Sequence, residues 1–449
     1  MTLRTSLLRE LVNPNLSVGG RAELCCELAK EFENKGEYDE AREVLSDLWP
    51  GREQRPRLEG LEPNIAAEVL MRAGVLTGWS SEQIADAQEK AKDLISESLT
   101  IFEYRQSKEK IAEAQTELAL CYMRAGEYSN ASDLLKLALT HLTTDCELKA
   151  KAVLRSGIVK RHASPLGEAL AYLTENESLF EKIDDQLLKG CYHQALGDVL
   201  KDLCESKSQE DYLDRAFIEY AAASFHLEQV GHKRYLANVE NNRGFLYLKI
   251  NYCNEAHEHL NRARRIFIAI NDRIALAQVD ETRARVFLKE KKDAEAEKAA
   301  CSAVRVLENS DRSSLLAEAL KRHGIALARL GSFNAALNAF RRAVDLYIAA
   351  DSFNRAADVS LTLYQELGEQ LAIKGAISAS GRPLDDEVFL LEQQLIKQAL
   401  ENAQGRVTSA ARTLGMSYQR LTHKLTTEHK DLLTERTPAR RRARKIVMS

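Results

Sequence analysis

The chain has 449 residues, of which 45% are apolar and 29% are charged, and its formal net charge at pH 7 is −4. Only 7 prolines and 21 glycines interrupt it and aromatic residues make up 6%, a composition that favours helices and argues against a mainly β fold. No stretch approaches the roughly 18 uncharged apolar residues of a membrane span, so we expect a soluble, cytoplasmic protein with no membrane partner.

Charge is distributed unevenly along the chain. Residues 405–449 contain 11 Lys and Arg against 3 Asp and Glu, a net charge of +8, whereas everything before them has a net charge of −12. An acidic body that ends in a short basic segment suggests that the segment binds a polyanion such as nucleic acid.

The eight cysteines form no C-x-x-C pair, and none lies at zinc-ligand spacing from a histidine. We expect them to act as small apolar side chains in a reducing compartment. The sequence therefore predicts no metal site and no cofactor.

Small residues recur in pairs 12 positions apart over the first three quarters of the chain. A small residue on each of two antiparallel helices lets their backbones approach closely, so each pair predicts a helix hairpin. Gly36, Gly126 and Gly331 each fall five residues before a second small residue, where a helix end needs a left-handed residue. The pairs are Ala29 with Ala41, Ala119 with Ala131, Gly157 with Ala169, Gly244 with Ala256, Ala284 with Ala296, and Gly324 with Ala336.

These units resemble tetratricopeptide repeats, which implies a solenoid over residues 1–376 whose concave groove binds a peptide or protein. The second unit has no clean pair of small residues, and in the fifth Gly197 and Ala216 lie 19 apart. We expect eight helix pairs, near residues 22–50, 65–104, 108–142, 147–182, 187–229, 236–270, 276–308 and 316–350.

Basic side chains recur five residues after the first small residue of five units. One hypothesis is a column in the groove that binds an acidic peptide or a carboxylate. The alternative is that each cation lies in the last turn of its helix and offsets the helix dipole. These residues are Arg124, His162, Lys249, Lys289 and Arg329.

The segment after the array contains three predicted helices. Residues 377–384 are expected to be a linker, and residues 385–430 a small domain. Its first helix spans 385–403, its second begins at Thr408 as N-cap and ends at Gly415, and its third has Ser417 as N-cap. A short helix, a glycine turn and a second short helix predict a helix-turn-helix.

The stretch "LIKQALENAQGRVTSAARTLGMSYQRLTHKL" resembles the Fis-type DNA-binding domain of bacterial enhancer-binding activators. Two positions depart from that pattern, since Arg406 replaces the usual Asn and Tyr418 the frequent Arg. The resemblance implies that the third helix enters the major groove of double-stranded DNA, where Arg420 would read guanine, Gln419 adenine, and Thr408 and Lys424 would contact phosphates. The face carried over is Ser417, Tyr418, Gln419, Arg420, His423 and Lys424.

Fis-type domains dimerise through the helices ahead of the motif. The apolar stripe from Val388 to Leu400 would then be a homodimer seam on a two-fold symmetric site with half-sites about one helical turn apart. The alternative is that this stripe only packs on the helix-turn-helix.

A basic tail, residues 431–449, ends the chain, and "RTPARRRARK" places six basic residues within ten. Arg440, Arg441 and Arg442 would either add sequence-independent phosphate contacts to DNA or only keep the tail solvated.

No phosphate-binding G-x-x-x-x-G-K-[ST] loop, G-x-S-x-G elbow or H-E-x-x-H helix occurs, so we do not expect an enzyme. The sequence predicts an all-α, bacterial DNA-binding transcriptional regulator whose tetratricopeptide array binds a partner. The alternative is a protein-protein interaction scaffold with a nonspecific basic tail that binds nucleic acid.

Overall fold

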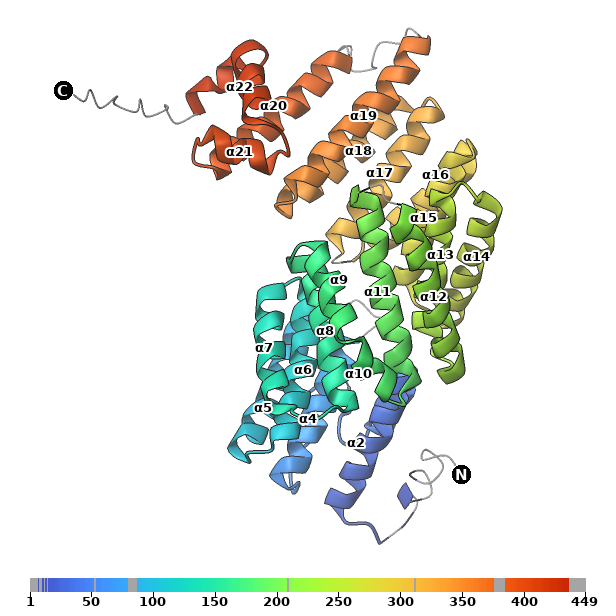
Figure 1. The fold of residues 1–449 in the computed structure, drawn as a ribbon, viewed down its shortest axis with the longest axis vertical. Coiled ribbons are helices and arrows are strands. Elements are labelled where there is room, and N and C mark those ends of the chain that lie inside the picture. Colours follow the sequence, from blue (N-terminus) through green and yellow to red (C-terminus); the bar gives the residue numbers. More distant parts are fainter. Residues whose placement is uncertain are drawn as a thin grey trace, which may run out of the picture. The chain divides into compact units, whose positions relative to one another are not determined.

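The computed structural model describes residues 15–51, 54–79, 87–207, 210–310, 312–374 and 384–435, together with positions 7, 10, 11 and 13. Across this part of the chain every regular element is a helix, so the predicted all-α fold is confirmed (Figure 1). None of these helices combines the length and the hydropathy of a transmembrane segment.

Each of the eight predicted repeat units appears as a helix hairpin. The fourth differs in that its second helix is divided in two. The array helices are α2 (Val18–Lys35), α3 (Tyr38–Val44), α4 (Pro63–Gly78), α5 (Ala87–Tyr104), α6 (Lys108–Ala125), α7 (Tyr128–His141), α8 (Glu147–Ala163), α9 (Leu166–Glu175), α10 (Glu177–Lys182), α11 (Gln186–Lys207), α12 (Glu210–Val230), α13 (Lys233–Lys249), α14 (Cys253–Ala269), α15 (Arg273–Lys289), α16 (Asp293–Leu307), α17 (Ser313–Arg329), α18 (Phe333–Ala349) and α19 (Phe353–Lys374), which follows the last hairpin.

The small residues lie where the two helices of a hairpin approach most closely. A Cβ atom added at Gly244 would lie 2.6 Å from Leu260 Cγ and 3.2 Å from the carbonyl oxygen of Ala256. At Gly324 it would lie 2.9 Å from the ring of Phe340. The 12-residue spacing therefore marks positions where a larger side chain would push two helices apart.

The second repeat unit, which has no pair of small residues at that spacing, reaches the same close approach of its two helices with a longer connection between them. A Cβ atom at Gly74 in α4 would lie 2.6 Å from Ile95 and 3.1 Å from the carbonyl oxygen of Ala91, both in α5. Gly74 and Ala91 lie further apart in the sequence than the small residues of the other pairs, so the close approach is present although the spacing hides it.

The predicted left-handed turns are confirmed at Gly36, Gly126 and Gly331, whose φ angles are 73°, 82° and 80°. Positions 251 and 291, which correspond to Gly331 in the two preceding units, adopt the same conformation with Asn251 (φ 62°) and Lys291 (φ 61°). The backbone of the repeat thus demands a positive φ even where the sequence lacks glycine.

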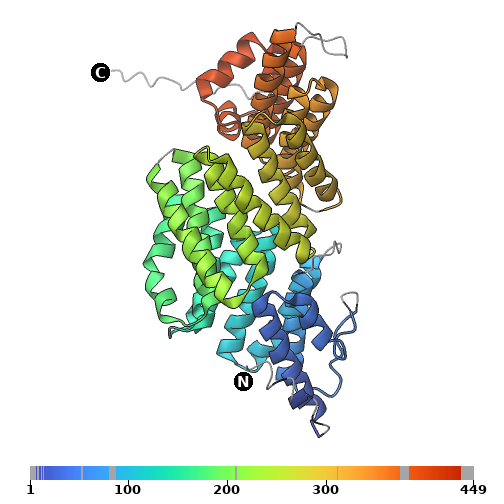
Figure 2. The same cartoon turned by 90° about the vertical axis from the view of Figure 1, so that its right-hand side faces the viewer.

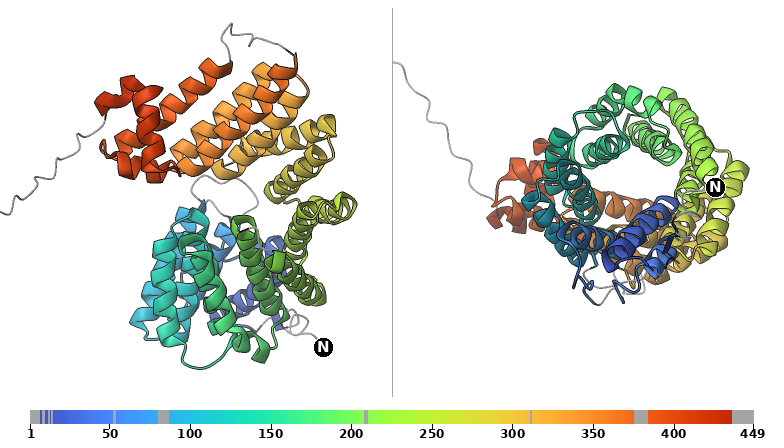
Figure 3. Two further views of the ribbon diagram at one scale, coloured as in Figure 1. Left: turned by 45° about the horizontal axis from the view of Figure 1, so that its top comes forward. Right: turned by 90° about the horizontal axis from the view of Figure 1, so that it is seen from below.

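The chain divides into two compact units, Met1–Ala275 and Leu276–Ser449. In the first, the helices run alternately up and down as neighbouring antiparallel pairs (Figure 2). Seen from below, they follow one another around a ring that returns toward its start (Figure 3, right). The first helices of successive hairpins contact one another in the order α2, α4, α6, α8 and α11.

The second unit contains α15 from residue 276 onward, α16 to α19, and then α20 (Leu384–Asn402), α21 (Val407–Thr413), α22 (Tyr418–Thr427) and the 3-10 helix η1 (Lys430–Glu435). Three helices were expected between residues 385 and 430, and all three are present. Thr408 is not the N-cap of the second, because that helix begins one residue earlier and Arg406 occupies the cap position. Of the predicted linker only Leu384 lies within the described residues, and residues 436–449 of the tail lie outside them.

Candidate functional site

The last three α-helices form a small core from which one face of α22 projects. Leu421 and Leu425 of α22 are buried, as are Leu395 and Leu400 of α20 and Ala410 and Ala411 of α21. Ser417 caps α22 as predicted, since its hydroxyl accepts a hydrogen bond from the backbone N–H of Arg420 at 3.2 Å. Gly405 and Gly415 close the two preceding turns with φ angles of 74° and 66°.

Most of the predicted DNA-binding residues of α22 are exposed. Helical geometry places Gln419 and His423 about opposite the buried Leu421 and Leu425, and Arg420 beside them. Tyr418 is also exposed, at the edge of this surface. The exposed side chains are Ser417, Tyr418, Gln419, Arg420 and His423 on α22 and its cap, and Thr408 on α21.

Lys424 lies differently from its neighbours on α22. Its Nζ atom is 2.8 Å from a carboxylate oxygen of Glu392 on α20 and 2.9 Å from one of Glu428, and its side chain is 18% exposed. Burial lowers the pKa of Lys424, but the hydrogen bonds to Glu392 and Glu428 outweigh it and raise the pKa. Buried His429 also contacts Glu392, with Nε2 3.2 Å from the carboxylate. The ammonium group is thus engaged in holding α22 on α20.

The five basic residues of the predicted groove column all lie in the last turn of a first helix, which is where the dipole alternative puts them. Arg124 Nη1 donates to the carbonyl oxygen of Gly78 at 2.7 Å, and its guanidinium lies 3.5 Å from the ring centroid of Trp79. Arg329 Nη1 donates to the carbonyl oxygen of Leu288 at 3.0 Å. In both cases the cation serves the helix end of the preceding unit.

The other three members of the column are exposed. His162 stacks on Tyr128 with ring centroids 4.8 Å apart, and Lys249 lies 5.1 Å from the ring centroid of Phe245. Lys289 is exposed at the end of α15.

Buried ion pairs connect the first helices of neighbouring hairpins in the first unit. Arg72 on α4, 2% exposed, donates to Glu33 on α2 at 2.7 Å and to Glu113 on α6 at 3.2 Å, and Glu68 lies 3.4 Å away on its own helix. Burial opposes the charge of Arg72, but these carboxylates outweigh it and raise its pKa. The spacing of charges along the sequence gave no sign of this network.

The next link of the network joins α6 to α8. Glu117 accepts from Arg155 and from Lys151, each at 3.0 Å. Burial opposes ionisation of Glu117, yet these two cations lower its pKa. Buried cations and carboxylates of neighbouring first helices are therefore paired with one another within the array.

A second cluster joins residues far apart in the sequence. The rings of Tyr38 and Trp79 stack at 4.8 Å, Trp79 meets Tyr235 edge-on at 6.5 Å, and Tyr235 stacks on His232 at 4.2 Å. Burial lowers the pKa of His232 to about 4, so this imidazole is neutral at pH 7. The first two hairpins thus contact the start of α13, which closes the ring seen in Figure 3.

The comparisons with known proteins agree with both parts of this description. Residues 390–426 match the family described as "Bacterial regulatory protein, Fis family". None of the curated proteins matches the chain. The matched segment begins in α20 and ends one residue before the end of α22, so it contains α21, the turn and all of the exposed residues named on α22.

Solved structures share the fold of the array at low sequence identity. A Rap protein complexed with Competence and Sporulation Factor superposes with a TM-score of 0.54 at 16% identity, over 84% of this chain and 99% of that one. The apo quorum sensor NprR from B. thuringiensis gives 0.53 at 11% identity, over 76% and 92%.

A signal transduction ATPase with a tetratricopeptide repeat sensor, from Pyrococcus horikoshii, gives a TM-score of 0.54 at 15% identity over 84% of this chain. This chain covers 56% of that longer protein. At such identities the likeness shows the fold alone. Residues 390–426 are a Fis-family helix-turn-helix domain, and the helix pairs that precede it have the tetratricopeptide-like fold.

Proposed function

We propose that this protein is a transcriptional regulator that binds a specific DNA site through α22. The exposed face formed by Gln419, Arg420 and His423 carries the proposal, because it projects from a capped and packed helix within the Fis-family match. Arg420 has the geometry to donate two hydrogen bonds to a guanine edge, and Gln419 to pair with adenine. Thr408 at the start of α21 and Arg440, Arg441 and Arg442 of the tail would add phosphate contacts.

The array is proposed to bind a peptide or protein that regulates this activity. Support comes from the fold, since the similar Rap protein was solved in complex with Competence and Sporulation Factor and the similar NprR is a quorum sensor. Of the basic column, His162, Lys249 and Lys289 are the exposed candidates for contacts with an acidic ligand. This assigns the protein a regulatory rather than a catalytic role, in the cytoplasm.

The DNA-binding proposal is tested by selecting duplexes from a random library with the full chain at low and at high salt. A recurring site that survives high salt is expected. Binding that disappears with salt and enriches no sequence would instead favour the scaffold with a nonspecific basic tail.

Arg420→Ala then identifies the reading residue. It should weaken binding to the selected site by about 5- to 150-fold, equivalent to 1–3 kcal/mol, and relax the preference at one base pair. Arg265→Ala, which removes an exposed arginine on α14, is the matched control and should leave the site and the affinity unchanged. Equal effects of the two substitutions would remove α22 as the reading element.

The possible homodimer stays a prediction, and the selected site tests it. Two copies on DNA require a two-fold symmetric site with half-sites about one helical turn apart. A single asymmetric site would indicate that one copy binds alone.

A further inference from the structure

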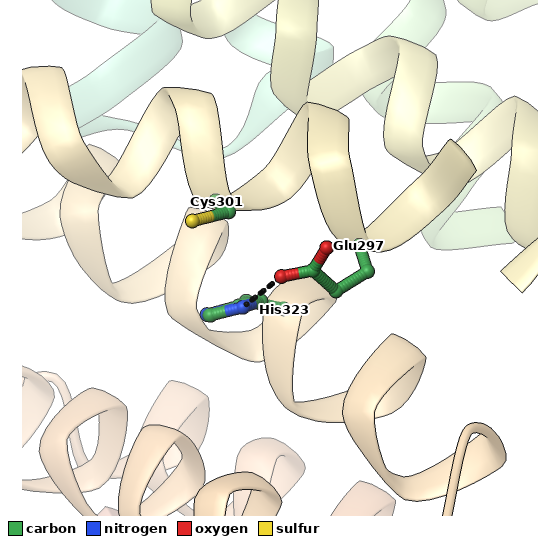
Figure 4. A group of neighbouring side chains, drawn as sticks. All are labelled: Glu297, Cys301 and His323. Atoms are coloured by element: carbon green, nitrogen blue, oxygen red, sulfur yellow. Dashed lines mark hydrogen bonds and ion pairs between the residues drawn. The ribbon is translucent and has the colours of Figure 1, made fainter. Parts of the chain in front are cut away.

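Three potential metal ligands meet on two neighbouring helices of the second unit. Glu297 and Cys301 lie one turn apart on α16, and His323 faces them from α17 (Figure 4). The carboxylate of Glu297 is 3.2 Å from His323 Nε2, and the three donor atoms all lie within 4.8 Å of one another. All three side chains are half-buried, so an ion has access from solvent.

The repeat fold does not require these residues. On α16 the buried side chains include Ala296, Ala300 and Ala303, whereas Glu297 and Cys301 in the adjoining positions are only half-buried. One repeat earlier in the chain, on α14 and α15, the equivalent positions 257, 261 and 283 hold a histidine, an asparagine and an arginine, which together could not form the same donor set. The combination is specific to the hairpins of α16 and α17.

We propose that Glu297, Cys301 and His323 bind a divalent transition metal ion of the Zn²⁺ type. Sulfur, imidazole and carboxylate are the ligands of that class, whereas Mg²⁺ and Ca²⁺ select oxygen donors. Around one tetrahedral Zn²⁺, with bonds of about 2.0–2.3 Å, neighbouring donors lie roughly 3.3–3.8 Å apart. The Glu297–His323 distance is close to that range, and Cys301 needs only a small side-chain movement to join them.

Binding replaces the contacts that the free side chains make. The hydrogen bond between His323 and Glu297 gives way to two bonds to the ion. The ring proton on His323 Nε2 is released to solvent, from which Nδ1 takes one up to keep the imidazole neutral, and Cys301 releases its thiol proton to solvent. Arg305, whose Nη2 lies 3.9 Å from Cys301 Sγ, is exposed and free to turn toward solvent. Three protein ligands leave a fourth position for water, and the bound ion joins α16 to α17, which belong to successive repeats.

A second group of potential ligands, Glu392, Glu428 and His429, leaves no place for a metal cation. There the ammonium group of Lys424 already lies 2.8–2.9 Å from both carboxylates and supplies the positive charge. It provides an internal comparison, because it contains no sulfur.

The test is a Co²⁺ titration of the reduced full-length chain, followed by absorption spectroscopy and displacement with Zn²⁺. Co²⁺ replaces Zn²⁺ and reports a thiolate ligand through a near-ultraviolet charge-transfer band. One Co²⁺ per chain with that band is expected, with tighter binding as pH rises because the thiol must ionise.

Two substitutions and a control assign the site. Cys301→Ser should abolish the charge-transfer band. His323→Gln should weaken Co²⁺ binding by at least about tenfold, but the band should remain at saturating Co²⁺ because the thiolate is still present. Cys253→Ser, which alters a half-buried cysteine on α14, should change neither. Any of three results would overturn the proposal. The first is a band that survives Cys301→Ser, and the second is equal Co²⁺ affinity in the wild type and His323→Gln. The third is Co²⁺ binding that shows no band and that Glu392→Gln abolishes. Circular dichroism of every variant confirms that the helices are intact.

Discussion

Glu33 and Glu113 both pair with the buried Arg72, but their pKa values shift in opposite directions. Burial raises the pKa of Glu33 to about 7 despite its bond to Arg72, since Arg72 is shared and Glu117 and Glu113 repel a further negative charge. Burial acts in the same direction on Glu113, but Arg72, Lys30 and Lys110 outweigh it and lower the pKa to about 2. Within the described residues Glu33 Oε1 has no hydrogen-bond partner, so no donor stabilises a negative charge on that atom.

These shifts predict opposite effects of two amide substitutions. Below its ordinary pKa of 4.5, Glu33 is protonated in both the folded and the unfolded chain. Between 4.5 and about 7 only the unfolded chain loses the proton, so the free energy of unfolding falls by about 3 kcal/mol as pH rises through this range. Glu33→Gln should remove that loss and stabilise the protein above pH 7. Urea denaturation at a series of pH values measures the free energy of unfolding.

Glu113→Gln is the matched comparison. A lowered pKa contributes stability above 4.5 that disappears as pH falls toward 2, so this substitution should destabilise the protein at neutral pH. If both variants lose stability at neutral pH, then Glu33 is ionised in the folded chain and burial does not dominate its pKa.

Lys424 leads to a prediction that separates packing from DNA contact. Lys424→Ala removes the pairs with Glu392 and Glu428 and should lower the free energy of unfolding of this region by about 1 kcal/mol. We expect the slope of log affinity against log salt to stay unchanged, because Glu392 and Glu428 already hold the ammonium group. A slope smaller by about 0.9, with unchanged thermal stability, would instead show that Lys424 contacts a phosphate, as the resemblance implies.

The exposed residues of α22 could be predicted from the sequence, because the motif fixes both the helix and its face. The direction of Lys424 could in part have been inferred as well, since it lies next to Leu425 and three residues after the buried Leu421. The partner on α20 could not, because no local pattern links Glu392 to a residue on another helix. The same holds for the Glu297, Cys301 and His323 group, whose members lie on two helices.

At the scale of the helix hairpin, glycine has opposite meanings at two positions. Gly244 packs against Leu260, which is fully buried, and an added Cβ atom would also lie 3.2 Å from the backbone carbonyl oxygen of Ala256. Gly167 in α9 has nothing within 4 Å of an added Cβ atom. Alanine in a helix reduces the entropy of the unfolded chain relative to glycine, so only the local space decides the sign.

Gly244→Ala is therefore expected to destabilise the protein by about 1–3 kcal/mol, whereas Gly167→Ala should stabilise it by up to about 1 kcal/mol. Thermal unfolding of the two variants beside the wild type measures both. Stabilisation by Gly244→Ala would mean that α13 and α14 can separate without cost, and that the 12-residue spacing does not mark a packing constraint.

Helix hairpins could be predicted from the sequence because a hairpin is local, with both of its small residues within one repeat. The second repeat unit, formed by α4 and α5, shows the limit of that reasoning. Its connection is longer, so Gly74 and Ala91 escape a search at the spacing of the other pairs, although the physical demand is the same.

At the scale of the first unit, the curvature of the array has a consequence that no repeat pattern contains. Tyr38 and Trp79 meet Tyr235 and His232 from distant parts of the sequence, because the successive hairpins turn far enough to return to their start. Gly36 is required there twice over: its φ is positive, and an added Cβ atom would lie 2.8 Å from His232 Nε2. A contact of this kind makes the stability of α13 depend on the first two hairpins.

The two tryptophans of the chain allow that dependence to be measured. Trp49 is buried in the core of the first hairpins, and its indole N–H donates to the carbonyl oxygen of Gln54 at 3.0 Å. Trp79 belongs to the closing cluster, with Arg124 over its ring. Replacing either tryptophan by Ala should lower the free energy of unfolding by about 3 kcal/mol. The two variants should differ, however, in which helices show faster amide hydrogen exchange under native conditions. Trp79→Ala should raise exchange at the start of α13, and Trp49→Ala should raise it only near the first two hairpins. If exchange in α13 is unchanged in Trp79→Ala, the aromatic contacts do not couple the two ends, and the ring is held only by its successive neighbours.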